Sequence, residues 1–274
     1  MRKYFHRNIA ITNEHGSWVF LLSPLVIGIF AGANWSTPLT YLIIAALSGF
    51  LIRHPITIAV KVHAGRRPRK DLPAARFWIL VYGAIGLLMV VGLVLRGFGY
   101  VLYLAIPGIP VFGWHLWLVS RRAERRQAGV EIVASGVLAL SAPAAYWISV
   151  GGTDPLGWWL WGLTWLQSAA SIVYAYLRLE QRTWREIPPL KTCLKSGRRA
   201  ILYSSFNLLL TGILAIWGWL PPWIFIPYAL QWGETLWGTL NPAVGVKPTL
   251  IGLRQLIVST LFTILFIITW NTHQ

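Results

Sequence analysis

Residues 77–95 read FWILVYGAIGLLMVVGLVL, an uncharged and almost wholly apolar run that Arg76 and Arg96 bracket. A helix rises ~1.5 Å per residue, so about 20 such residues cross the ~30 Å hydrocarbon core of a bilayer. The run therefore predicts a transmembrane helix, and other apolar runs of similar length are interpreted in the same way.

Eight further apolar segments of similar length accompany this one. They lie near Trp18–Asn34, Thr40–Val60, Gly99–Val119, Ile132–Val150, Leu156–Leu177, Ala200–Trp219, Trp223–Leu240 and Leu250–Trp270. We expect an all-α, polytopic membrane protein with nine transmembrane helices and a single integral membrane domain over residues 1–274. Two long basic loops, near Lys61–Arg76 and Arg178–Arg199, each follow the second helix of a four-helix group. This repeated placement predicts helices one to four (about 12–119), helices five to eight (about 129–240) and a ninth (about 250–270).

The basic residues are distributed asymmetrically about these segments. Of the 24 Lys and Arg residues, Arg96 alone falls on the side of the short loops. Basic loops stay in the cytoplasm, which predicts a cytoplasmic amino terminus and an external carboxyl terminus. The net charge of +16 then fits loops that lie against anionic lipid headgroups, so we expect membrane lipids and no nucleic acid as partners. Residues 1–16 contain no apolar core, so the first span itself is expected to direct insertion.

Proline interrupts several of the predicted helices. Pro107 and Pro110, in Ile106-Pro107-Gly108-Ile109-Pro110, remove two backbone donors from the fourth segment. We expect a bend there. Bent helices can enclose a cavity, although packing alone explains the prolines equally well.

The first group of candidate binding residues stands at the entry to the first segment. Asn13, Glu14 and His15 precede Gly16, where a ligand or a second backbone could approach closely. Asn13 could instead cap the helix, and Glu14 suits the positive end of its dipole. Both interpretations stay open for these residues.

The second group lies on the second segment. His54 and Lys61 are seven residues apart and share a face if the helix continues through Pro55, and Arg53 precedes them. Ionisable groups at such depth are costly and are usually functional, so we expect Arg53 and His54 to line a cavity. The run Arg66–Lys70 is better explained as ordinary cytoplasmic charge.

The third group belongs to segments six to eight and comprises Arg178, Glu180, Asn207 and Glu234. Glu234 is the deepest acid, so it should pair with a cation such as Arg53 or take up a proton. A purely structural ion pair is the alternative. Asn207 could simply join two helices through a hydrogen bond.

Metal and cofactor chemistry has little support in the sequence. There is no Cys pair and no Gly-rich phosphate loop, so no metal site and no cofactor are predicted. His54 and His115 both fall near cytoplasmic helix ends, and a haem held between them is a minor alternative that the sequence cannot test.

Two family resemblances follow from these motifs. Asn13-Glu14-His15-Gly16-Ser17-Trp18, with the Arg-rich loop and the overall length, resembles the YwiC-like family of bacterial membrane proteins, which implies the bacterial cytoplasmic membrane. A more distant likeness is to the UbiA superfamily of intramembrane prenyltransferases, with nine helices in the same two-group plan. Arg66-Arg67-Pro68-Arg69-Lys70-Asp71-Leu72-Pro73 is similar to the end of that superfamily's first motif. Its second motif resembles the region of Glu180, Glu186, Thr192 and Gly197.

The chain departs from the UbiA pattern where that superfamily binds metal. UbiA-type enzymes hold a prenyl diphosphate through Mg²⁺ on several Asp carboxylates, whereas this chain has only Asp71 and Asp154. Cations occupy the corresponding region, so Mg²⁺ is not expected, although an anion could be held directly.

Three functions are compatible with this pattern. The first is a binding protein with a cytoplasm-facing, cation-lined cavity for an anionic amphiphile, such as an isoprenoid phosphate, a lipid phosphate or a quinone precursor. The second is a prenyltransferase-like enzyme that uses Arg53, Lys61 and Arg178 in place of metal, with Glu14, His15 or Glu234 as the base. The third is a transporter of small molecules. The sequence leaves open whether the protein is an enzyme.

Overall fold

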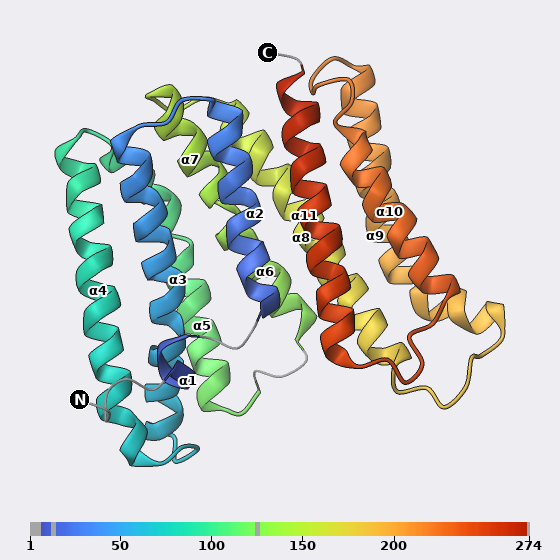
Figure 1. Cartoon of the computed structure of the whole chain (residues 1–274), viewed down its shortest axis with the longest axis horizontal. Helices are drawn as coiled ribbons and strands as arrows, with labels where there is room; N and C mark the ends of the chain where they lie inside the picture. The colour runs from blue at the N-terminus through green and yellow to red at the C-terminus, as the bar shows by residue number, and fades with distance from the viewer. Residues whose placement is uncertain (1–6, 12–14, 124–126, 273–274) are drawn as a thin grey trace.

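The computed structural model describes residues 7–11, 15–123 and 127–272, and every regular element within these ranges is a helix (Figure 1). The elements are α1 (Arg7–Ala10), α2 (His15–Gly32), α3 (Thr37–His63), η1 (Arg69–Asp71), α4 (Leu72–Leu95), η2 (Gly99–Ala105), α5 (Gly108–Ser120), α6 (Ala128–Ala139), α7 (Ser141–Val150), α8 (Leu156–Gln181), α9 (Leu190–Ile216), α10 (Phe225–Leu240) and α11 (Pro248–Asn271). Helices satisfy their own backbone hydrogen bonds, which an apolar surrounding requires.

Six helical stretches within the described residues are long and apolar enough to cross a membrane. They are Thr37–His63, Arg69–Leu95, Gly99–Ser120, Ala128–Val150, Leu190–Ile216 and Pro248–Asn271. Ser17–Gly32 is apolar but shorter. All nine predicted segments coincide with helix, although α8 and α10 fall outside these six. The count of nine spans therefore stays a prediction.

Two of the nine predicted segments are each divided into two helices. The fourth breaks at Ile106 and Pro107 into η2 and α5, because Pro107 lacks the amide that would continue the hydrogen bonding. Pro110 is tolerated because it lies in the first turn of α5. The fifth breaks at Leu140 between α6 and α7. The described residues therefore do not form nine continuous helices, whereas α3 does continue through Pro55 as expected.

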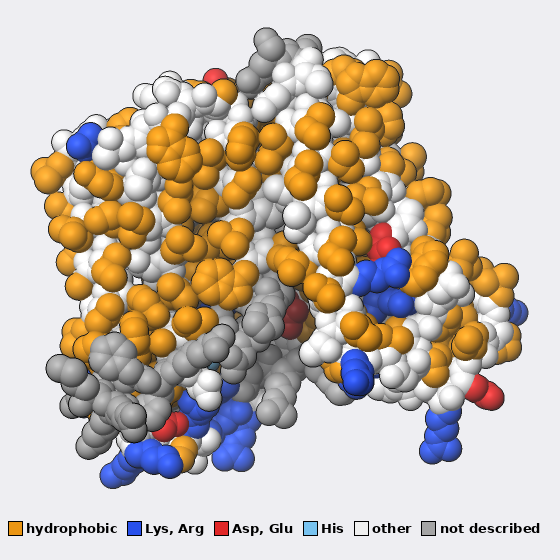
Figure 2. Space-filling model, viewed as in Figure 1, with side chains coloured by type: hydrophobic (Ala, Val, Ile, Leu, Met, Phe, Trp, Pro, Cys, Tyr) orange, Lys and Arg blue, Asp and Glu red, His pale blue; other side chains and the backbone are white. Residues whose placement is uncertain are grey.

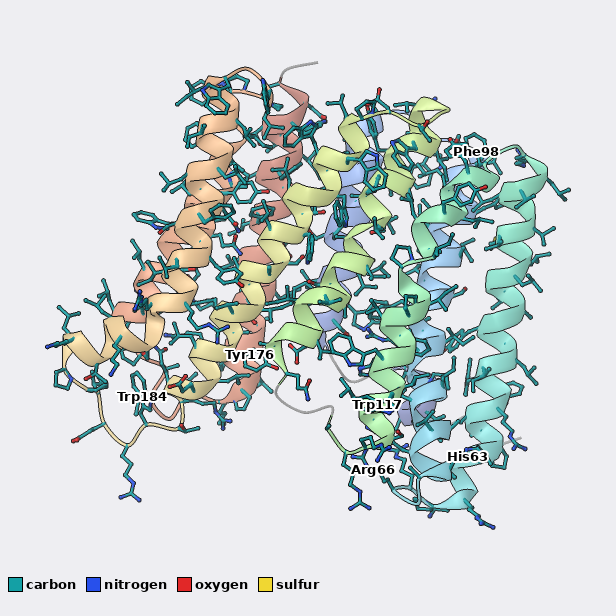
Figure 3. All side chains as sticks on the ribbon, turned by 180° about the vertical axis from the view of Figure 1, so that it is seen from behind. His63, Arg66, Phe98, Trp117, Tyr176 and Trp184 are labelled. Atoms are coloured by element: carbon teal, nitrogen blue, oxygen red, sulfur yellow. The ribbon has the colours of Figure 1, made fainter. Side chains whose placement is uncertain are left out.

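One end of the bundle is strongly basic. Figure 2 shows Lys and Arg side chains gathered mainly at this end, with hydrophobic side chains covering the flank above it. His63 and Arg66 lie at this end in Figure 3, and Phe98 lies at the other. Arg96, which follows the last residue of α4, belongs to the end occupied by Phe98. The separation of charge expected from the sequence is thus present, while its assignment to the two sides of a membrane is a proposal.

Helix α2 occupies the middle of the bundle. It packs mainly against α7 and α11, while α3 pairs with α4 and α9 pairs with α10 (Figure 1). Gly28 lets α2 approach α7 closely, because a Cβ there would stand 2.2 Å from the Ala142 carbonyl oxygen. A main hydrophobic core, including Ile27, Leu160 and Phe262, fills the space between these central helices. Neither the division into four, four and one nor the UbiA-like plan is tested by this packing.

Candidate anion-binding groove

An open groove of about 360 Å³ lies between α8, α10 and α11. Its apolar walls are formed largely by the first three turns of α11, which contribute Leu250, Ile251, Leu253 and Ile257. Tyr174, Arg178, Trp237, Arg254 and Gln255 supply its polar and aromatic lining. The groove therefore combines apolar walls with two guanidinium groups.

Arg178 is the buried cation of this groove. It stands in the last turn of α8 with 6% of its surface exposed. Its Nη1 donates to the carbonyl oxygens of Gly238 (2.6 Å) and Asn241 (2.7 Å) and to Oε1 of Gln181 (2.9 Å). Carbonyls at a helix end lack partners within their own helix, so Arg178 satisfies the end of α10. Among the residues that the structure describes, the hydrogen bonds of the Arg178 guanidinium are all made by Nη1, and Nε and Nη2 have no hydrogen-bond partner.

Arg254 is the second cation and is held by three contacts of different kinds. Its Nε donates to Oε1 of Glu234 at 2.6 Å, and its Nη2 donates to Oε2 at 2.7 Å. Its guanidinium carbon lies 3.6 Å from the centre of the Trp237 ring, and Arg178 faces the same ring at 5.6 Å. Tyr174 completes the cluster because its hydroxyl donates to Oε1 of Glu234 at 2.7 Å.

The charges in the groove do not cancel. Arg178 and Arg254 line the groove and carry two positive charges, while Glu234 lies beside it, pairs with Arg254 and carries one negative charge, which leaves one positive charge in excess. Glu234 is shielded, with 10% of its side chain exposed, whereas 43% of the Arg254 side chain is exposed. A guanidinium binds phosphate or carboxylate through parallel hydrogen bonds, so this arrangement can hold an anion.

The structure brings together two of the predicted site residues, Arg178 and Glu234. Glu234 has an ionic partner, as expected, but that partner is Arg254 on the neighbouring α11 and not Arg53. Asn207 is not in the groove: its Nδ2 donates to the Leu166 carbonyl oxygen at 2.8 Å and joins α9 to α8. Glu180 is exposed on the last turn of α8.

The remaining described candidates lie on α3, apart from the groove. That helix packs against α1, α4, α5 and α7, while α8, α10 and α11 form the groove. The Arg53 guanidinium stands 4.8 Å from the centre of the Phe50 ring, and His54 Nε2 donates to the Asn8 carbonyl oxygen at 3.1 Å. A cavity lined by Arg53, His54 and Lys61 stays a prediction.

Three candidates from the entry to the first segment cannot be placed. Asn13 and Glu14 lie outside the described residues. His15 begins α2, but its side chain also lies outside what the structure describes.

Within the described ranges, no group of three or more His, Cys, Asp or Glu side chains is placed to hold a metal ion. Of the two His residues considered for haem, His54 uses Nε2 for the Asn8 carbonyl, and the His115 ring lies 6.4 Å from that of Phe112. The structure therefore adds no support for a cofactor.

Sequence reasoning missed Arg254, Trp237 and Tyr174. Arg254 carried a usable signal, because it is the only ionisable residue inside the ninth apolar segment, Leu250–Trp270. No sequence signal pointed to Trp237 and Tyr174, since Trp and Tyr are common throughout this chain and at membrane interfaces generally.

The long apolar helices and the apolar flank define the class of protein: this is an all-helical, multi-pass membrane protein. A family model described as YwiC-like protein matches residues 11–146, and this part of the chain belongs to the YwiC-like family.

A curated relative from Bacillus subtilis (strain 168), named "Uncharacterized protein YwiC", is 26% identical over 165 residues, which are 58% of this chain and 61% of the relative. The chain thus covers less than two thirds of that relative's length. No solved structure matches the chain. The family match ends at residue 146, before α8, so it does not include the groove.

Proposed function

We propose that this protein binds an anionic amphiphile in the groove between α8, α10 and α11. The ligand's phosphate or carboxylate contacts Arg178 and Arg254, and its hydrocarbon part lies along the apolar walls. An isoprenoid phosphate, another lipid phosphate or an anionic quinone precursor has the required chemistry.

The observation that carries this proposal is the partial use of Arg178. A buried guanidinium is expensive unless its donors are satisfied, and here only Nη1 has partners among the described residues. Arg178 lines a groove whose volume falls within the ~300–1,000 Å³ typical of small-molecule sites. An anion supplies the acceptors that Nε and Nη2 lack.

The site's place in the membrane is part of the proposal. Nine spans, made from the six long apolar stretches together with α2, α8 and α10, put the groove near the basic end of the bundle. Basic ends face the cytoplasm in bacterial inner membranes, so the groove opens toward the cytoplasmic leaflet. This order of spans is the one that a UbiA-like scaffold requires, without that superfamily's Asp-rich magnesium site.

The test is to identify lipids that remain with the purified protein. Wild-type protein is extracted in polymer-bounded native nanodiscs, and tightly bound lipids are quantified by mass spectrometry. We expect one anionic amphiphile in stoichiometric amount, and its loss in Arg178→Gln. Arg69→Gln is the matched control, because Arg69 is an exposed cation of η1 outside the groove.

Arg178 also satisfies the end of α10, so a second variant separates binding from folding. Arg254→Lys keeps the charge but loses the guanidinium donors that remain beside those bound to Glu234, and it should weaken retention of the lipid while leaving the protein folded. Equal retention in all four proteins would refute the proposal. A prenylated product that accumulates only with wild-type protein would show an enzyme instead.

A further inference from the structure

A second, much smaller space lies beside the groove, deeper in the bundle. Its volume is about 10 Å³. Its polar lining includes Gln167, Ser171 and Tyr174 of α8, Gln231 and Glu234 of α10, and Gln255 of α11. Tyr174 and Gln255 line both spaces. We call this smaller space the amide chamber.

Among the described residues, one polar atom of the amide chamber has no hydrogen-bond partner. Gln231 has 6% of its surface exposed, and its Nε2 donates to the Gln167 carbonyl oxygen at 3.0 Å. Its Oε1 is buried and accepts no hydrogen bond from any residue that the structure describes. Gln255 does not supply it: its Nε2 donates to the Ser171 carbonyl oxygen at 3.0 Å and makes no hydrogen bond to Gln231. An unsatisfied buried acceptor is costly, so Gln231 Oε1 needs a donor beyond those that the described residues supply.

We propose that the amide chamber binds a single water molecule that donates to Gln231 Oε1. A space of about 10–15 Å³ on this measure accommodates one water, provided that polar partners surround it. The chamber meets both conditions, with an orphaned acceptor and hydroxyl, amide and carboxylate groups around it.

The local charge favours water over a monovalent cation of similar size. Both oxygens of Glu234 already accept from Arg254, and Oε1 also accepts from Tyr174. The guanidinium groups of Arg178 and Arg254 stand beside the same cluster and would repel a cation. A neutral donor satisfies Gln231 without that repulsion.

The bound water would link the buried amide of Gln231 to the cluster that holds Arg254. This site does not depend on the amphiphile, since its evidence is the orphaned acceptor and not the shape of the groove. The failure of one proposal would therefore leave the other standing.

The test is a cryo-electron microscopy map of the full chain in lipid nanodiscs, at a resolution that shows ordered water. We expect a density peak at hydrogen-bonding distance from Gln231 Oε1, equally strong in sodium chloride and in choline chloride. An empty chamber would overturn the proposal. So would a peak that requires sodium, because it would mark a cation site.

A pair of α11 variants provides the matched comparison. Ser259 is buried and lines the chamber, so Ser259→Val adds a branched side chain there and should remove the peak. Thr260→Val likewise replaces a hydroxyl by a methyl group, at the next, exposed position, and should retain the peak. A peak that persists unchanged in Ser259→Val would contradict the assignment.

Discussion

At the scale of single residues, Arg254 and Glu234 form an unequal pair. Arg254 is partly exposed, and its long side chain can follow the surface toward the polar end of the bundle. Glu234 is shorter and well shielded, and it depends on Arg254 and Tyr174 for its stabilisation. Loss of Arg254 should therefore affect stability differently from loss of Glu234.

Arg254→Gln should destabilise the protein more than Glu234→Gln, because it leaves a buried carboxylate without its countercharge. In the double variant the two losses should not add, with a coupling free energy of about 0.5–3 kcal/mol. Reversible unfolding in mixed micelles measures all three values. Additive losses would show that the ion pair contributes nothing to stability.

Gly238 permits the close contact between α10 and Tyr174. A Cβ at this position would stand 2.1 Å from the Tyr174 hydroxyl and 2.7 Å from Cε2 of its ring. Gly238→Ala should displace Tyr174 from Glu234 and cost about 1–3 kcal/mol, the range for overpacking. Gly233→Ala, on the same helix with open space around it, should be tolerated. Equal melting temperatures for the two variants would contradict this account.

At the scale of elements, α2 depends on small residues where it meets α7. Gly28 and Gly32 are four residues apart and face Ala142 and Ser149, so the two backbones approach closely. Small residues at this spacing favour helix contacts in membranes, where packing replaces the hydrophobic effect. The motif is visible in the sequence, but the sequence does not show which helix it contacts.

Gly28→Ala should force α2 away from α7, because the new Cβ would meet a backbone carbonyl that cannot rotate aside. We expect a loss of about 1–3 kcal/mol or more in unfolding free energy. Gly49→Ala on α3 has open space around it and serves as the control. Thermal unfolding in the same detergent compares the two, and an unchanged melting temperature for Gly28→Ala would contradict the packing.

At the scale of the whole molecule, the positions of the helices were predictable and the groove was not. Apolar runs such as 77–95 fall on α4 because each helix satisfies its own backbone within a local stretch of chain. The groove brings together Arg178 of α8 and Arg254 of α11, and Glu234 of α10 pairs with Arg254 beside it, so the site depends on the rotation and packing of three helices. The sequence predicted a cation partner for Glu234 and offered Arg53 as an example, whereas the partner in the structure is Arg254.

The orientation of the bundle gives a prediction for the intact cell. In a Cys193→Ser background, Gly152→Cys should react with a membrane-impermeant maleimide added outside, because the loop after α7 is expected to be external. Lys70→Cys, in η1 at the basic end, should react only after the membrane is opened. The reverse pattern would invert the proposed topology.

Arg254 has a consequence for the bilayer around the protein. It is the seventh residue of α11, about 9 Å from the start of that helix, and it is partly exposed on the flank of the bundle. A guanidinium at that depth draws water and phosphate groups inward, so the adjoining lipid should thin where α10 and α11 face it. The bilayer around the protein would then be thinner on this side than on the others, and an amphiphile could leave the membrane plane through the thinned region.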